Sequence, residues 1–218
     1  MRASRRSAIL LALLATFART PLSAQDPAPA SFPQQRHGFW WSLGLGYGRM
    51  DFSCGDTPNP VDGPPFPCAE AGRAHATLGS LRVGYALSQQ VAVSMLVDAS
   101  HRVGTSEGVV DLGAALRLYP LPARGWFVEA GVSRSEFRGH ATDGPDEVGR
   151  GVGLVAGTGW DLRVDRKMSL TPVLQVHYGH QGDTGMPNVL ILPDGSKFTV
   201  HTRVHETVVT FGVAVTFH

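Results

Sequence analysis

The sequence lacks any apolar run long enough to cross a membrane as a helix. The run at residues 8–17 is about half of the roughly 20 residues that a spanning helix needs, and no later stretch is long enough either. A membrane role would therefore require a closed barrel, which satisfies every backbone hydrogen bond internally. The formal net charge is only +1, so composition gives no electrostatic case for binding nucleic acid.

The first 24 residues have the organisation of a secretory signal peptide. A basic segment and the apolar run are followed by Leu22-Ser23-Ala24, a plausible cleavage site before Gln25. Residues 25–37 are rich in proline and alanine, and we expect them to form a flexible periplasmic leader. This leaves residues 38–218 as one exported domain.

Cysteine and lysine are both scarce. Lys167 and Lys197 are the only lysines, which indicates arginine-preferring codon usage rather than a function. Cys54 and Cys68 are the only cysteines, and both lie in the proline- and glycine-rich stretch 51–72. Because exported compartments are oxidising, we expect a disulfide between them. Closing a loop of about 15 residues would stabilise the protein by roughly 3 kcal/mol.

The mature chain is dominated by an alternation of bulky apolar residues with small or polar ones. In the last segment the bulky set is Val209, Phe211, Val213, Val215 and Phe217, and the other set is Thr210, Gly212, Ala214 and Thr216. The same period of two recurs in residues 41–48, 77–85, 91–100, 110–119, 126–133, 152–163 and 170–179. The pattern predicts eight strands, each with one bulky apolar face.

Charged residues within these strands fall on the small-residue face. They are Arg82, Asp98, Asp111, Arg117, Glu129, Asp161 and Arg163. A lipid-facing charge would cost about 2–4 kcal/mol at the bilayer midplane, so we predict that the bulky face meets lipid and the charged face lines the interior. Eight strands enclose a space that side chains can fill. We therefore interpret the charges as a paired polar plug, with a conducting path as the alternative.

The predicted connections alternate between long and short along the chain. Long connections follow the first, third, fifth and seventh strands, as in outer-membrane barrels whose short turns face the periplasm. The last long connection, residues 180–204, contains Pro193-Asp194-Gly195-Ser196, which predicts a hairpin extending the last two strands, with an open edge that could add a partner's strand. Val204 and Val208 have the opposite parity to Val209, which predicts either a bulge near Val208 or that the strands are not extended in this way.

From Phe39 to Phe217 the chain resembles the eight-stranded outer-membrane barrels of the OmpA and OmpX type. The resemblance lies in the glycine-alternating segment 41–48, in Tyr85-Ala86-Leu87-Ser88 at a strand end, and in the aromatic-ended last strand. It implies an all-β fold, an eight-stranded antiparallel up-and-down transmembrane barrel in the bacterial outer membrane. It also implies contact with outer-membrane lipid and lipopolysaccharide, and recognition of the C-terminal strand by the barrel-assembly machinery.

A soluble up-and-down barrel of the lipocalin type is the alternative fold. Its apolar faces would point inward, and glycines such as Gly44, Gly153 and Gly157 would face water, where charged residues are usual. The aromatic residues near predicted strand ends fit an interfacial girdle instead. These are Trp40, Trp41, Trp126, Tyr47, Tyr85 and Tyr178.

The fold alone implies little about activity, because this architecture hosts adhesins, anchors, channels and enzymes. We expect a structural, adhesion or surface-interaction role, with an extracellular partner at the loops. The alternatives are a narrow channel for ions or small solutes and a lipid A-modifying enzyme. The candidate catalytic groups, Ser100, His101 and Glu107 or Ser135, Glu136 and His140, lack a deacylase-type His-x-Ser-Asn motif, so we expect no enzyme.

Histidines gather near the outer end of the last predicted hairpin. They are His177, His180, His201 and His205. Their spacing matches no recognised ligand pattern, so we expect neither a metal site nor a cofactor.

Overall fold

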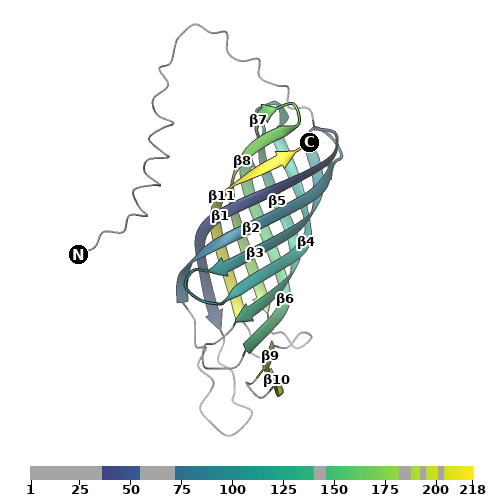
Figure 1. The fold of residues 1–218 in the computed structure, drawn as a ribbon. Coiled ribbons are helices and arrows are strands. Elements are labelled where there is room, and N and C mark those ends of the chain that lie inside the picture. The colour runs from purple at the N-terminus through teal and green to yellow at the C-terminus, as the bar shows by residue number, and fades with distance from the viewer. Residues whose placement is uncertain (1–35, 55–71, 140–145, 182–187, 192–194, 201–203) are drawn as a thin grey trace, which may run out of the picture. The chain divides into compact units, whose positions relative to one another are not determined.

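The computed structural model describes residues 36–54, 72–139, 146–181, 188–191, 195–200 and 204–218. These residues form a closed antiparallel barrel of eight strands (Figure 1). The strands are β1 (Gly38–Cys54), β2 (Gly72–Ala86), β3 (Val91–Arg102), β4 (Gly108–Leu121), β5 (Trp126–Gly139), β6 (Asp146–Trp160), β8 (Met168–Gln181) and β11 (Val204–Phe217). Pairing of β1 with β11 closes the barrel and confirms the predicted fold class.

Three shorter strands and one helical turn complete the described residues. A 3-10 helix, Pro122–Arg124, joins β4 to β5, and β7 (Leu162–Asp165) pairs with the beginning of β8. The strands β9 (Asn188–Ile191) and β10 (Lys197–Val200) form a hairpin. Its strand β9 pairs with residues 146–148 of β6, next to the residues 151–159 of β6 that pair with β8. The hairpin therefore extends β8 and β11 along β6, as predicted.

The two ends of the barrel differ in their connections. The C-terminus and β7 lie at one end, and β9 and β10 lie at the other (Figure 1). The turns after β2 and β4 are short. The connection from β3 to β4, at the opposite end, was expected to be long but consists only of residues 103–107, because β3 continues to Arg102. Following the orientation predicted from the sequence, we call the end with the C-terminus the periplasmic end and the opposite end the outer end.

Burial alternates along the strands as the sequence predicts. Leu45, Met95 and Phe211 face outward and are 79%, 63% and 63% exposed, whereas Leu96 and Phe127 face inward and are fully buried. A soluble barrel would place its bulky apolar residues inward, so the lipocalin-type alternative is excluded. The exposed apolar belt is the surface that lipid covers in a membrane barrel.

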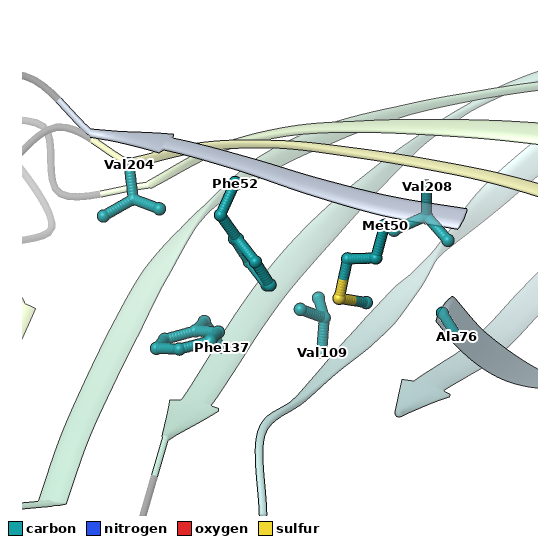
Figure 2. Packing of buried hydrophobic residues seen from close by; sticks show 7 residues of the cluster. All are labelled: Met50, Phe52, Ala76, Val109, Phe137, Val204 and Val208. Carbon is teal, nitrogen blue, oxygen red and sulfur yellow. The ribbon is translucent and has the colours of Figure 1, made fainter. Parts of the chain in front are cut away.

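Apolar side chains fill both ends of the interior. The outer cluster consists of Met50, Phe52, Ala76, Val109, Phe137, Val204 and Val208 (Figure 2). The periplasmic cluster consists of Trp40, Ala86, Ala92, Tyr119 and Phe127, and a small cluster of Leu96, Ala115 and Val155 is separate from both.

Two expectations are corrected by these clusters. The register of β11 against β1 and β8 is continuous through Val208, so the predicted bulge is absent. Val204 and Val208 point inward instead, because the outer end of the interior is apolar and accepts them. Trp40 is buried in the periplasmic cluster and therefore does not belong to the aromatic girdle.

Candidate functional site: the barrel interior and the outer rim

Four of the charged residues meet in one buried network. Arg82 on β2 donates to both oxygens of Asp98 on β3, at 2.6 and 2.9 Å, and its Nε donates to Glu129 Oε1 at 3.2 Å. Glu129 on β5 also accepts from Arg117 Nε on β4, at 2.9 Å. Two guanidinium groups and two carboxylates thus alternate around the interior and balance their charges. Bidentate, charge-assisted bonds of this kind are among the strongest in proteins.

The guanidinium group of Arg117 also connects this network to the periplasmic cluster. Its carbon lies 4.0 Å from the centroid of the Phe127 ring and 4.7 Å from that of Trp40. Such cation–π contacts contribute about 2 kcal/mol or more when they are desolvated. The contacts explain why aromatic residues occupy inward positions next to an arginine.

Arg36 fills the periplasmic end of the interior. Its guanidinium carbon lies 3.7 Å from the Tyr119 ring centroid, its Nη1 donates to the carbonyl of Pro122 at 2.9 Å, and its Nε is 3.6 Å from Asp161. Asp161 also accepts from Tyr119 and Thr171, at 2.8 and 2.9 Å. The last part of the predicted leader therefore packs into the barrel. Sequence reasoning missed Arg36 because it precedes the first strand.

A second polar layer includes His177 and Asp111. Asp98 and Asp111 are cross-strand partners on β3 and β4, and the imidazole of His177 lies 3.6 Å from each carboxylate. Asp111 also accepts from Ser133 Oγ at 2.8 Å. The imidazole thus separates two carboxylates that would otherwise repel each other.

A further buried carboxylate, Glu206, lies beside the outer cluster. It accepts from Gln181 Nε2 at 3.1 Å and from Ser135 Oγ at 3.5 Å. Neither Glu206 nor Gln181 was predicted as an interior residue. Their parity could have identified them, because Glu206 shares the face of Val208 and Thr210, which are both buried.

The other predicted site residues lie elsewhere. Arg163 is half-buried near the periplasmic end and donates to the carbonyl of Arg166 at 3.0 Å. The side chain of Cys54 and all of Cys68 lie outside the described residues, so the disulfide remains a prediction.

His218 follows β11 at the periplasmic end of the barrel. Its Nε2 is 3.1 Å from Ser169 Oγ, and its backbone N–H donates to the carbonyl of Lys167 at 2.9 Å. Burial, together with repulsion from Arg163, lowers the pKa of the His218 imidazole to about 4.

The candidate catalytic groups are not assembled. Ser100 faces the interior, whereas His101 is adjacent in the same strand and faces outward. Glu107 pairs with Arg102 at 2.7 Å. In the second set, Ser135 faces inward and Glu136 faces outward, where it pairs with arginines, and His140 lies outside the described residues.

The histidines at the outer end do not form one group. His177 faces the interior, and His201 lies outside the described residues. His180 and His205 face outward as direct cross-strand partners on β8 and β11, with their Nδ1 atoms 3.0 Å apart. Within the described part of the chain, no group of three or more His, Cys, Asp or Glu side chains could hold a metal ion.

Comparison with known proteins identifies the fold. The sequence matches no protein-family model. It also matches no curated protein. The solved structure of outer membrane protein OprG from Pseudomonas aeruginosa is similar at 12% identity and a TM-score of 0.52, over 85% of this chain and 99% of that one. Neisserial surface protein A is similar at 14% identity and a TM-score of 0.48, over 83% and 98% of the two chains.

The chain therefore has the fold of the small outer-membrane barrels of the OmpA and OmpX type. The described residues contain no helix that is long and apolar enough to cross a bilayer. The closed hydrogen-bonded wall and the exposed apolar belt are what a bilayer requires of a spanning barrel. The protein thus has the fold of a small membrane-spanning barrel, similar to that of solved outer-membrane proteins.

Proposed function

We propose that this protein is a side-chain-filled anchor that presents its outer loops for adhesion or another surface interaction. The observation that carries the proposal is the filling of the interior at both ends and between them. Arg36 occupies the periplasmic end, the Arg82–Glu129 network follows, and the outer cluster around Phe52 and Phe137 occupies the outer end.

The interior contacts argue against a channel. An ion that passed through would have to separate Arg82 from Asp98 and Arg117 from Glu129, and each of these side chains is at most 5% exposed. Breaking one partner out of such a buried pair costs about 3–5 kcal/mol. The outer cluster then adds an apolar layer that offers an ion no ligands. A barrel filled in this way serves as an anchor, so the segments at its outer end would carry the function.

The outer rim also supports a specific contact with lipopolysaccharide. A surface groove there is lined by Arg49, Asp51 and Arg73 at one side and by Val209 and Phe211 at the other. Arg73 pairs with Asp51 at 2.9 Å, whereas Arg49 has no ion pair within the described residues. Arginine suits phosphate recognition, and the apolar side of the groove suits an acyl chain. We include lipid A phosphate at Arg49 in the proposal.

The closing strand supports recognition by the barrel-assembly machinery. Its bulky residues face outward, and the Phe217 ring stacks on that of Trp41 with centroids 4.3 Å apart. This aromatic pair lies at the seam between β1 and β11, where the first and last strands pair and close the barrel. We include C-terminal strand recognition in the proposal for this reason.

Replacing the segment that connects β1 and β2 tests the proposed function. We would exchange residues 55–71 for the short turn sequence of residues 87–90. The wild type and this variant would then each be displayed on cells. The proposal predicts that the barrel persists, as judged by its boiling-dependent gel mobility, while adhesion of the cells to host-cell surfaces is lost. The matching exchange of residues 140–145 serves as a second test. Wild-type cells that adhere no better than cells without the protein would contradict the proposal.

A further inference from the structure

A pair of imidazole rings occupies the outer end of the seam between β8 and β11. His180 and His205 are direct cross-strand partners, their ring centroids lie 4.5 Å apart, and the two Nδ1 atoms are separated by 3.0 Å. Both side chains face outward and are half-buried. The two Nδ1 atoms are therefore close enough to share one proton or one metal ion.

This separation matches two neighbouring ligands of one metal ion. Histidine nitrogens bind Zn²⁺ at about 2.0–2.1 Å, and two of them at tetrahedral or square-planar angles lie roughly 2.9–3.4 Å apart. The alternative is a hydrogen bond, which requires one ring to carry its proton on Nδ1 and the other to lack it. An ion that replaces this single proton would use both nitrogens without moving either strand.

Tyr178 supplies a third group on the same face. Its hydroxyl lies 3.1 Å from His205 Nδ1, and its ring stacks on the His205 ring at a centroid distance of 6.1 Å. The cross-strand partner of His205 on β1 is Ser53, and that of His180 on β6 is Val152, so neither adjacent strand places a charge directly opposite the pair. Water could complete the coordination because the pair faces outward near the strand ends.

We propose that His180 and His205, with Tyr178 beside them, form a binding site for a divalent transition metal ion of the imidazole-preferring class. Cu²⁺ is the strongest-binding member of this class for nitrogen ligands, followed by Ni²⁺ and Zn²⁺. A bound ion would fasten β8 to β11 near the outer end of their paired region. The site is independent of the proposed anchoring function, since it requires only the two paired strands.

Copper titration of the refolded chain in detergent, without a histidine tag, tests the site. The structure predicts one Cu²⁺ per chain at this site, with an electron paramagnetic resonance spectrum that shows nitrogen ligation. His180→Gln and His205→Gln should each weaken binding at least tenfold, because one ligand of the pair is lost. Tyr178→Phe should alter the spectrum and weaken binding less.

His75→Gln is the matched control for this experiment. His75 also faces outward at the outer rim and stacks on a tyrosine, Tyr47, with centroids 5.5 Å apart, but no second imidazole contacts it within the described residues. This variant should bind Cu²⁺ as the wild type does. Boiling-dependent gel mobility verifies that every variant is folded. Equal binding by the wild type and the doubly substituted His180→Gln, His205→Gln protein would overturn the proposal, as would an equal loss in His75→Gln.

Discussion

Arg117 and Glu129 are direct cross-strand partners on β4 and β5, and their side chains meet inside the barrel with Nη2 and Oε2 2.8 Å apart. The same carboxylate accepts a hydrogen bond from Arg82, so a single residue joins two arginines that come from different strands. Glu129 is therefore the centre of the interior network. Removing its charge leaves Arg82 paired with Asp98 alone and takes from Arg117 the carboxylate with which it pairs.

Glu129→Gln should lower the free energy of unfolding by about 3–5 kcal/mol. The reason is that it removes the carboxylate charge of two buried ion pairs and leaves the charges of the arginines buried. Urea unfolding in lipid vesicles measures the change. Glu136→Gln is the control, since Glu136 pairs with Arg138 and Arg150 at the exposed rim. Exposed pairs contribute about 0–1 kcal/mol. Equal losses in the two variants would contradict a structural role for the interior network.

Phe137→Ala should destabilise the barrel through the outer cluster. Phe137 packs edge to face against Phe52, with ring centroids 5.3 Å apart (Figure 2). Removing a buried phenylalanine leaves a cavity and typically costs about 3–5 kcal/mol. Phe211→Ala, on the lipid-facing side, removes the same atoms without opening an interior cavity. A larger loss for Phe211→Ala in vesicle unfolding would show that the outer cluster contributes little.

Gly48→Ala should hinder closure of the seam between β1 and β11. A Cβ at Gly48 would overlap the Val209 carbonyl and lie 2.6 Å from Thr210 Cα, which are backbone atoms that cannot move independently of the strand. Overpacking of this kind costs about 1–3 kcal/mol. Gly79→Ala is the control, because its Cβ would meet only the Ala99 carbonyl at 4.0 Å. The folded fraction after refolding, read from gel mobility, should fall for Gly48→Ala alone.

The stability of the protein should depend on pH through His218. Its pKa in the folded protein is lowered to about 4 from 6.5, so the unfolded chain binds more protons between these values. The folded state therefore loses stability as the pH falls from about 6.5 to about 4. His218→Asn removes this contribution, and the difference between the two unfolding curves measures it. The account would be contradicted if the wild type and His218→Asn differed in free energy of unfolding by the same amount at pH 7.5 and at pH 4.5.

The alternation of residues was sufficient to predict the strands and their faces. Bulky residues such as Leu45 and Met95 are exposed, and the charged residues from Arg82 to Asp161 face inward, as period two requires. The rule that bulky apolar residues face outward failed at the two ends of the barrel, where the interior is filled by apolar side chains. Val208 and Trp40 are inward for this reason, although their hydrophobicity suggested lipid contact or a bulge.

The contacts between strands could not be predicted from the sequence. Which arginine meets which carboxylate depends on the stagger of neighbouring strands, and alternation does not determine that stagger. The Arg82–Glu129 contact joins strands that are not neighbours, so it also depends on closure of the barrel. The catalytic candidates could have been rejected earlier, because Ser100 and His101 are adjacent in a strand and must face opposite sides.

Single-channel recording in planar bilayers tests the central claim of a filled barrel most directly. The account predicts no stable conductance steps for the refolded wild type at either polarity. A steady conductance that changes in Glu129→Gln but not in Glu136→Gln would contradict it, because ions would then pass through the interior network. That result would make the protein a narrow channel lined by Arg82, Arg117 and Glu129.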